Sequence, residues 1–472
     1  MKRRKAIAEI RVDRTRGWVL PTFGSNNLLA FAVFSVLATL TALANIPEQK
    51  VWPTHQETIS VTERWRRQLP SDTPFSNLNG IPNSASRFDG LDNIRLAAQR
   101  GDPVAQFRLG KLYDEGLGVP KNPEEAAKWY QRAADQGLPI AEYFIGVLYV
   151  EGKGKEQNFT NAATCFRKAA EEGFVPAQFV WAVSLHFGGG VETNHAEAVT
   201  WYQKAAARNY APAQCNLGAM YEEGLGVPQD LREAVRLYRL AAEQKFALAQ
   251  HNLAVCFARG IVVTQSFVEA AKFYRLAAEQ GYSLAQHNLG NAYHKGRGVE
   301  RNPAEAAKWF KCAAEQGVSE AQLAYGVCCG GGEGVVQNWK EAAAWFAKAA
   351  EQGNPGGQAA LGRCYFDGTG VQRNLDLAAK LTRAAAEAGY PPGQRFCGSL
   401  YAMGRGVQKD RAEAYKWFTL AAQQGEREAQ QLRLRLVGEM TADEIVDGTK
   451  RAKTFVPVAS TEKLQKFYPT PP

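Results

Sequence analysis

The sequence predicts an all-α fold, a right-handed αα superhelix (solenoid) of nine 36-residue helix pairs with helical caps. One 36-residue pattern recurs without insertion or deletion over residues 105–428. Glycines return at fixed places in this pattern, and an Ala-Ala pair occupies the same place in every copy. A register this strict is typical of stacked units, each of which buries its apolar face only against its neighbours.

The first predicted helix of each copy carries a glycine in its interior. With positions numbered from 1 at Ala105, position 6 is glycine in every copy except two, which have Ala182 and Ala254. A glycine inside a helix costs roughly 1 kcal/mol relative to alanine. We expect close approach to the Ala-Ala pair at positions 29 and 30 to offset this cost. Position 9 is mostly tyrosine, and positions 25 and 26 are mostly an aromatic pair, which predicts that most tryptophans belong to the core.

Each copy also has its own turn and helix-start signals. A Gly-x-Gly-Val segment follows the first helix and supplies residues that adopt positive φ. Position 18 is Asn or Asp in eight copies and Ser266 in the other. In the segment Asn302-Pro303-Ala304-Glu305, an N-cap side chain precedes a proline and a carboxylate in the first turn. A second helix is therefore expected to begin at position 19.

The regions outside the nine repeats predict two caps, a linker and a tail. Leu96 to Gly101 repeat the pattern of positions 28–33, and residues 91–104 are expected to form an N-terminal capping half-repeat. Residues 429–450 begin a tenth first helix without a Gly-x-Gly turn, and we expect a C-terminal capping helix followed by a tail over residues 451–472. Residues 47–90 contain five prolines and are expected to be a flexible linker with a reach of roughly 35–40 Å.

The N-terminal segment predicts contact with a membrane. Seven Lys and Arg residues within residues 1–27 precede seventeen uncharged residues that begin at Leu28, close to the lower limit for a membrane span. The basic charge would keep residues 1–27 in the cytoplasm and place the repeats on the extracytoplasmic (periplasmic) side. Residues 28–46 are either a transmembrane signal anchor or the core of a signal peptide. Cleavage of the signal peptide near Ala44 would give a secreted protein.

Charge and cysteine placement argue against two classes of protein. The net charge of +9 is concentrated at the N-terminus, because residues 105–428 hold 35 basic and 33 acidic side chains. A nucleic-acid-binding array would carry its basic charge on the folded repeats, so no nucleic-acid partner is expected. Cys256, Cys328 and Cys364 share position 8, and no repeat carries a cysteine pair at a fixed spacing. We therefore expect small apolar core residues and no disulfide framework.

The repeat resembles the Sel-one-like repeats, relatives of the tetratricopeptide repeat. The resemblance rests on Ala-x-x-x-Leu-Gly-x-x-Tyr, then Gly-x-Gly-Val, then Ala-x-x-Trp-Tyr/Phe-x-x-Ala-Ala and a closing Gly, and it covers residues 91–440. It implies an αα superhelix whose first helices line a concave face, used as an adaptor or scaffold in signalling, envelope and quality-control complexes. One secreted, cysteine-rich branch of this family is linked to penicillin binding, but the present chain lacks the cysteine pair of that branch.

A polar row in repeats 4 to 6 is the candidate partner-binding site. Asn216, Asn252 and Asn288 share position 4, and by analogy with tetratricopeptide grooves they face the concave side, where stacked amides can bind a peptide backbone. The alternative is that these repeats only share solvent-exposed polar residues. Nearby basic residues would favour an acidic partner. The other predicted members of the site are His251, His287, Asn291, Arg259 and Lys295.

These observations predict a non-catalytic protein-protein interaction scaffold of the cell envelope. Its partner is a protein or peptide of unknown identity, and we expect no catalytic residue, cofactor, metal or small-molecule substrate. The segment Ser460-Thr461-Glu462-Lys463 matches the Ser-x-x-Lys pattern of penicillin-interacting enzymes without their companion motifs. The alternative function is an envelope enzyme of the cysteine-rich repeat type with penicillin-binding or weak β-lactamase activity.

Overall fold

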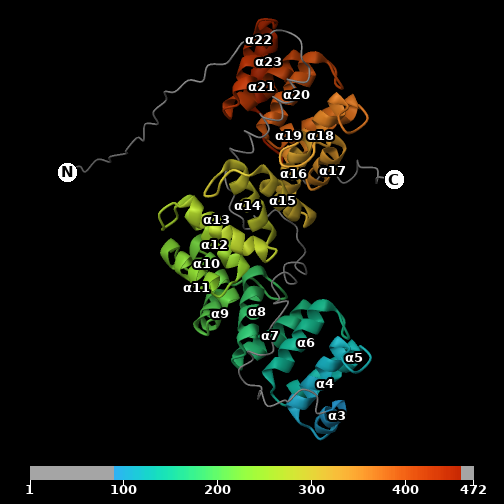
Figure 1. Cartoon of the computed structure of the whole chain (residues 1–472), viewed down its shortest axis with the longest axis vertical. Coiled ribbons are helices and arrows are strands. Elements are labelled where there is room, and N and C mark those ends of the chain that lie inside the picture. Colours follow the sequence, from blue (N-terminus) through green and yellow to red (C-terminus); the bar gives the residue numbers. More distant parts are fainter. Residues whose placement is uncertain (1–89, 459–472) are drawn as a thin grey trace, which may run out of the picture. The chain divides into compact units, whose positions relative to one another are not determined.

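The repeats fold as predicted into consecutive pairs of antiparallel helices. A computed structural model describes residues 90–458, which all belong to one compact unit. These residues form twenty-one helices and no strand. Except at the C-terminal end, each helix packs on the helices before and after it in the chain, so the pairs stack in sequence order (Figure 1). The expected N-terminal region 1–27, the apolar segment 28–46, the linker up to residue 89 and the tail beyond residue 458 lie outside the described residues.

Nine helix pairs make up residues 103–423. The first helices are α4 (Pro103–Glu115), α6 (Pro139–Glu151), α8 (Val175–Phe187), α10 (Ala211–Glu223), α12 (Ala247–Arg259), α14 (Ser283–Lys295), α16 (Ser319–Gly331), α18 (Pro355–Asp367) and α20 (Pro391–Met403). The second helices are α5 (Pro123–Ala134), α7 (Phe159–Glu171), α9 (His195–Ala207), α11 (Leu231–Glu243), α13 (Phe267–Glu279), α15 (Pro303–Glu315), α17 (Trp339–Glu351), α19 (Leu375–Glu387) and α21 (Arg411–Gln423). The first helix of each pair therefore begins two residues before position 1.

The helix boundaries follow from the capping signals. The side chain at position 18 accepts a hydrogen bond from a backbone N–H of the first turn in all nine repeats, as Asn338 does from Glu341 at 3.1 Å. The first glycine of each turn ends the preceding helix in the left-handed region, as Gly368 does at φ 75°. At the second glycine, such as Gly406, an added Cβ would overlap the carbonyl of Leu375 in the preceding repeat. This turn therefore also sets the spacing between repeats.

The prediction that the position-6 glycine approaches the Ala-Ala pair is wrong. An added Cβ on Gly326 would lie 2.6 Å from Cε1 of Phe346, the position-26 ring of the same repeat. The Ala-Ala pair instead meets position 1 of the following repeat, where a Cβ on Gly357 would lie 2.6 Å from Cβ of Ala349. The glycine thus makes room for an aromatic ring within a pair, and small residues bring consecutive pairs together.

The predicted tryptophan core is confirmed only in part. The position-26 side chains are buried in every repeat. At position 25, Trp345 and Trp417 are buried, whereas Trp129, Trp201 and Trp309 are partly exposed. A cation lies over each exposed ring, such as the Lys204 ammonium 3.6 Å from the Trp201 ring centroid. Seven of the eight cysteines are buried, as expected for small core residues, and all eight are free thiols.

The two ends of the stack differ in construction. At the N-terminal end, the half-repeat is a single helix, α3 (Leu91–Gln99), packed on α4. At the C-terminal end, the expected capping helix is two helices, α22 (Arg427–Val437) and α23 (Ala442–Lys453). Their connection is too short for a Gly-x-Gly turn, and α23 packs against α21. Phe455, beyond α23, contacts the ring of Trp417 with centroids 5.3 Å apart.

Repeat 5 offers a direct test of the turn geometry. Val262 takes the place of the second turn glycine and adopts φ 63°, a conformation that costs a non-glycine residue about 1–2 kcal/mol. We expect Val262→Gly to raise the free energy of unfolding of this region by about 1 kcal/mol, measured by hydrogen exchange of α12 and α13. The control Val263→Gly, at a neighbouring residue without positive φ, should not stabilise. Equal protection in wild type and Val262→Gly would contradict this account.

Candidate functional site

The first helices form one side of the stack, which we call the inner face. In repeats 7 to 9, neighbouring first helices contact one another, α16 with α18 and α18 with α20. No two consecutive second helices of the complete described repeats make a contact of similar extent. In these repeats the stack is therefore tighter on the side of the first helices.

The predicted polar row lies on the first helices of repeats 4 to 6 and joins them through side-chain hydrogen bonds. His251 lies between two asparagines, with Nδ1 3.3 Å from Oδ1 of Asn252 and Nε2 3.1 Å from Nδ2 of Asn288. A neutral ring that carries its proton on Nδ1 satisfies both contacts, since it donates to Asn252 and accepts from Asn288. The Asn252 amide donates in turn to Sγ of Cys215 at 3.7 Å. Asn252 and Asn288 thus each reach position 3 of the preceding repeat.

The ends of the row make similar but separate contacts. Asn216 is buried and donates to the hydroxyl of Tyr202 at 3.3 Å. Asn291 donates to Nε2 of His287 at 2.9 Å, one turn earlier on the same helix. His287 also has a buried Nδ1 without a hydrogen bond in the described residues. The row therefore consists of two inter-repeat networks, one at Tyr202 and one at His251, and one contact within α14.

Burial narrows the part of the row that can contact a partner. Asn216 is 3% exposed and His251 is 1% exposed, so both act inside the stack. Six predicted residues are partly exposed: Asn252, Asn288, Asn291, His287, Arg259 and Lys295. Binding of a partner by these residues stays a prediction. The analogy with tetratricopeptide grooves could not show that position 3 packs against the aromatic side chain at position 26.

The histidines of this region are held in the neutral form by burial. Burial lowers the pKa of His251 to about 4, and the hydrogen bond to Asn252 opposes the shift only in part. Burial likewise lowers the pKa of His186 to about 4, where Nδ1 lies 3.4 Å from the Tyr202 hydroxyl. The pKa of His287 is also lowered by burial, while the Glu320 carboxylate opposes this shift. Protonation of these rings therefore opposes the fold.

A glutamine ladder is a second polar feature, which the sequence analysis missed. In seven repeats the position-2 glutamine is buried and donates to the alanine carbonyl at position 30 of the preceding unit, as Gln286 does to Ala278 at 3.1 Å. In six of these its Oε1 accepts from the position-32 glutamine of its own repeat, as from Gln316 at 2.7 Å. One amide thus joins three helices. The recurrence of glutamine at positions 2 and 32 was the signal in the sequence.

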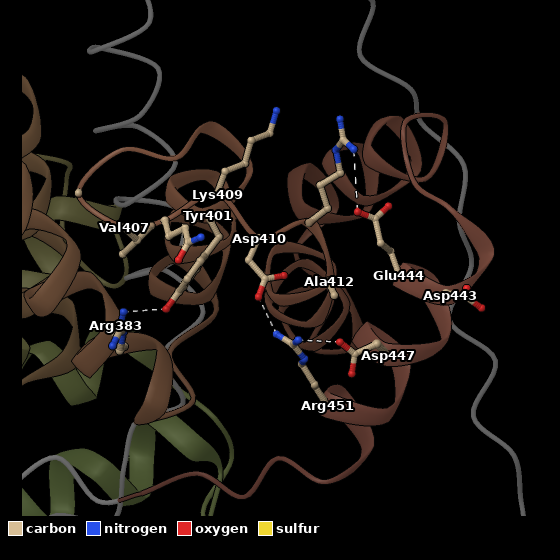
Figure 2. A pocket seen from close by; sticks show the side chains of 13 residues that line it. Arg383, Tyr401, Val407, Lys409, Asp410, Ala412, Asp443, Glu444, Asp447 and Arg451 are labelled. Atoms are coloured by element: carbon tan, nitrogen blue, oxygen red, sulfur yellow. Dashed lines mark hydrogen bonds and ion pairs between the residues drawn. The ribbon is translucent and has the colours of Figure 1, made fainter.

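A pocket lies at the C-terminal end of the stack, away from the predicted row. Arg383 and Tyr401 line one side, and Asp447 and Arg451 of α23 line the other (Figure 2). Arg451 contacts three carboxylates: Asp410 Oδ2 at 2.8 Å, Glu413 Oε2 at 3.0 Å and Asp447 Oδ2 at 2.6 Å. The first two carboxylates belong to the N-terminal turn of α21. The charges of this pocket therefore hold α23 in place.

Gly448 shows why α23 fits against the last repeat. An added Cβ on Gly448 would lie 2.7 Å from the carbonyl oxygen of Ala412, in the first turn of α21. In complete repeats the second turn glycine of the next repeat approaches the corresponding helix start. Helix α23 thus covers the exposed start of α21 where a tenth turn is missing. Within the described residues, no group of three or more His, Cys, Asp or Glu side chains could hold a metal ion.

Comparisons with known proteins point to one repeat family. The family model described as Sel1 repeat matches nine consecutive segments, 103–138, 139–174, 175–210, 211–246, 247–282, 283–318, 319–354, 355–390 and 391–426. These segments begin two residues before position 1, where the first helices begin. No described helix is long and apolar enough to cross a membrane.

Two solved structures and one curated protein are similar to this chain. The first is c5321, a protective antigen of uropathogenic Escherichia coli strains displaying an SLR fold, at 30% identity over 81% of this chain and 90% of that chain, with a TM-score of 0.49. The second is a Sel1 repeat protein from Oxalobacter formigenes, at 30% identity over 66% of this chain and 90% of that chain, with a TM-score of 0.47. The sel1-like repeat-containing protein L18 of Acanthamoeba polyphaga mimivirus is 40% identical over 42 residues, which span 9% of this chain and 7% of that protein.

The buried histidines predict loss of stability in mild acid. Because the pKa of His251 is lower in the folded state than its usual value near 6.5, its contribution is complete only above about pH 6.5 and falls progressively down to about pH 4. We expect the free energy of unfolding to fall by about 1–2 kcal/mol per buried histidine between pH 7.5 and pH 5, measured by urea unfolding. His251→Gln should reduce this pH dependence, and an unchanged dependence in that variant would contradict the assignment.

The Arg451 contacts predict that α23 can be loosened separately from the repeats. Arg451→Ala removes three carboxylate contacts, so we expect faster hydrogen exchange in α23 and unchanged exchange in α4 to α19. Lys450→Ala, at an exposed neighbour on the same helix, is the matched control and should leave the exchange of α23 unchanged. Equal exchange of α23 in wild type and Arg451→Ala would show that these ion pairs do not hold the helix.

Proposed function

We propose that this protein is a scaffold whose inner face binds a partner protein segment. The chain belongs to the Sel1 repeat family, because the family model matches nine segments over residues 103–426. Sel1 and tetratricopeptide-like repeat proteins are generally protein-interaction scaffolds. The single observation that supports a binding site in repeats 4 to 6 is a cluster of partly exposed amides beside two basic side chains. These are Asn252, Asn288, Asn291, Arg259 and Lys295.

The amides of this cluster keep hydrogen-bonding capacity for a ligand. Asn288 and Asn291 each use Nδ2 in a contact with a histidine nitrogen. A side-chain amide has two N–H donors and an acceptor oxygen, so a donor and the oxygen of each remain for an extended peptide. The histidine contacts also fix the orientation of the amides. Pre-oriented amides lose less conformational entropy when a ligand binds.

The charge along the inner face suggests the polarity of the partner. Position 11 is Glu223 in repeat 4, and it changes to Arg259 and Lys295 in repeats 5 and 6. A partner segment with acidic side chains at the level of repeats 5 and 6 would match this change. We therefore propose an extended, acidic protein segment as the ligand of this face.

The cell envelope is the proposed location. This proposal is supported by the basic residues before Leu28 and by the uncharged run that follows them. The mass of the mature protein in membrane and soluble fractions would test it. A full-length chain in the membrane fraction supports a tethered scaffold, and a soluble chain that begins near residue 45 supports a released one. A full-length chain in the cytosol would contradict both.

The scaffold is favoured over an envelope enzyme. Burial raises the pKa of the Cys256 and Cys328 thiols to about 12, and of Cys364 to about 11, which keeps these side chains protonated and poorly nucleophilic. None of the residues singled out on the inner face combines a nucleophile with an adjacent base.

The binding proposal predicts a charge-dependent loss of partner. We expect the double variant Arg259→Glu and Lys295→Glu to recover at least tenfold less partner than wild type in quantitative cross-linking, because each close charge reversal costs on the order of 1 kcal/mol. Lys308→Glu, on an exposed site of the second helix α15, is the matched control and should retain the partner. Equal recovery by both variants would rule out repeats 5 and 6 as the docking surface, without excluding a scaffold that binds elsewhere.

A further inference from the structure

The last first-type helix of the stack, α22, has an uncovered face. In complete repeats, positions 2, 3 and 6 of the first helix pack against the second helix of the same repeat, and Gln106 and Phe107 are accordingly buried. The corresponding residues of α22 are Gln430, Gln431 and Leu434, and all three are exposed, Leu434 to 62%. Its opposite face is covered, because Ala429 and Leu436 are buried.

Helix α23 follows α22 in the chain but does not cover this face. In complete repeats, the second helix makes its most extensive contacts with the first helix of its own pair. Helix α23 instead makes its main contacts with α21, through Gly448 and the Arg451 carboxylate contacts. Helix α22 is therefore half of a repeat without its second helix.

The helix at the other end, α3, is the complementary half. Its residues fall in the register of a second helix, since Ala97 and Ala98 occupy positions 29 and 30. Within the described residues it has no first helix of its own. Position 26, buried in every complete repeat, is the partly exposed Ile94, and position 25 is the exposed Asn93.

We propose that α3 of a second copy of this chain packs on α22 and completes a tenth helix pair, which joins the stacks head to tail. Compared with the complete repeats, this contact has a larger residue at position 6 and a smaller residue at position 26. Six complete repeats pair a position-6 glycine with a large aromatic ring, whereas this contact pairs Leu434 with the smaller Ile94.

The glutamine ladder extends into the proposed contact. In six complete repeats the position-2 glutamine accepts a hydrogen bond from the position-32 glutamine, as Gln106 does from Gln136 at 2.7 Å. At the proposed contact, Gln430 is at position 2 and Arg100 of the second copy is at position 32. The guanidinium is a donor only, and the glutamine Oε1 can accept from it. Both side chains are exposed and available for this bond.

Such a contact uses different surfaces on the two copies. A head-to-tail interface leaves α3 free on the first copy and α22 free on the second, so it allows open chains of copies. The inner faces of several copies would then follow one another and present repeated partner sites. An extended partner could bind several weak sites at once and gain avidity.

Site-directed disulfide formation in the full-length chain tests this contact. At Gly362, an added Cβ lies 3.4 Å from Cβ of Leu381, a position-6 to position-25 pair close to the Cβ separation of a disulfide. One chain should carry Leu434→Cys and a differently tagged chain Asn93→Cys, both in a Cys312→Ser background because Cys312 is the one native thiol that is not buried. After mild oxidation we expect a covalent dimer that contains both tags.

The control separates docking from random collision. In the control, the second chain carries Asp92→Cys in place of Asn93→Cys. Asp92 is at position 24, a position that faces solvent in the complete repeats, as Lys128 does with 63% of its side chain exposed. We expect at least about tenfold less dimer with this control, since a docked pair has a far higher effective concentration than free chains. Equal yields from the two pairs, although both thiols react with a maleimide, would overturn the proposal. A product between two Leu434→Cys chains in excess of the mixed product would overturn it as well.

Discussion

Contact between small residues of consecutive helix pairs is the constraint on which the stack depends. Position 1 is alanine or glycine in every repeat, and it meets the Ala-Ala pair that ends the preceding second helix. This approach brings the helices close enough for one glutamine side chain to reach two neighbouring helices. A larger side chain at Ala349 or Gly357 would separate the pairs and break the ladder hydrogen bonds, which leaves buried amides without partners. The polar and the apolar parts of the core therefore depend on the same spacing.

The register of the sequence was sufficient to predict the helices but not their contacts. Helix starts followed from the position-18 caps and turns from the glycines, because both depend on local chemistry. The partner of the position-6 glycine was mistaken, since glycine and the Ala-Ala pair lie on different faces of their helices. The same limit applies to the candidate site. Because Asn216 and Asn252 share position 4, the sequence predicted that both lie on the same surface, but only the packing shows that Asn216 is buried.

The asparagine row combines a structural and a binding role. The amide nitrogen of Asn288 donates a hydrogen bond to His251 of the preceding repeat, and the oxygen of the same amide remains available to a ligand. In the remaining repeats, position 4 carries other side chains, such as Phe144, whose ring lies 5.4 Å from that of Phe107. Repeats 4 to 6 thus replace apolar contacts with hydrogen bonds that are directional. This exchange gives a surface of oriented polar groups at the cost of sensitivity to protonation of the histidines.

The non-glycine residues with positive φ in the described chain lie in or next to the repeats that carry this row. Three non-glycine residues adopt positive φ, Asn209, Lys245 and Val262, and they belong to repeats 3, 4 and 5. In other repeats the same positions are glycine, so the strain is local to this part of the stack. Repeat 5 also has Ala254 in place of the position-6 glycine. Backbone strain costs on the order of 1 kcal/mol per residue and tends to occur where a site constrains the chain. Because stability in a repeat array depends on neighbouring units, we expect these repeats to be less stable than their neighbours, and a ligand that bridges them would then stabilise the centre of the stack.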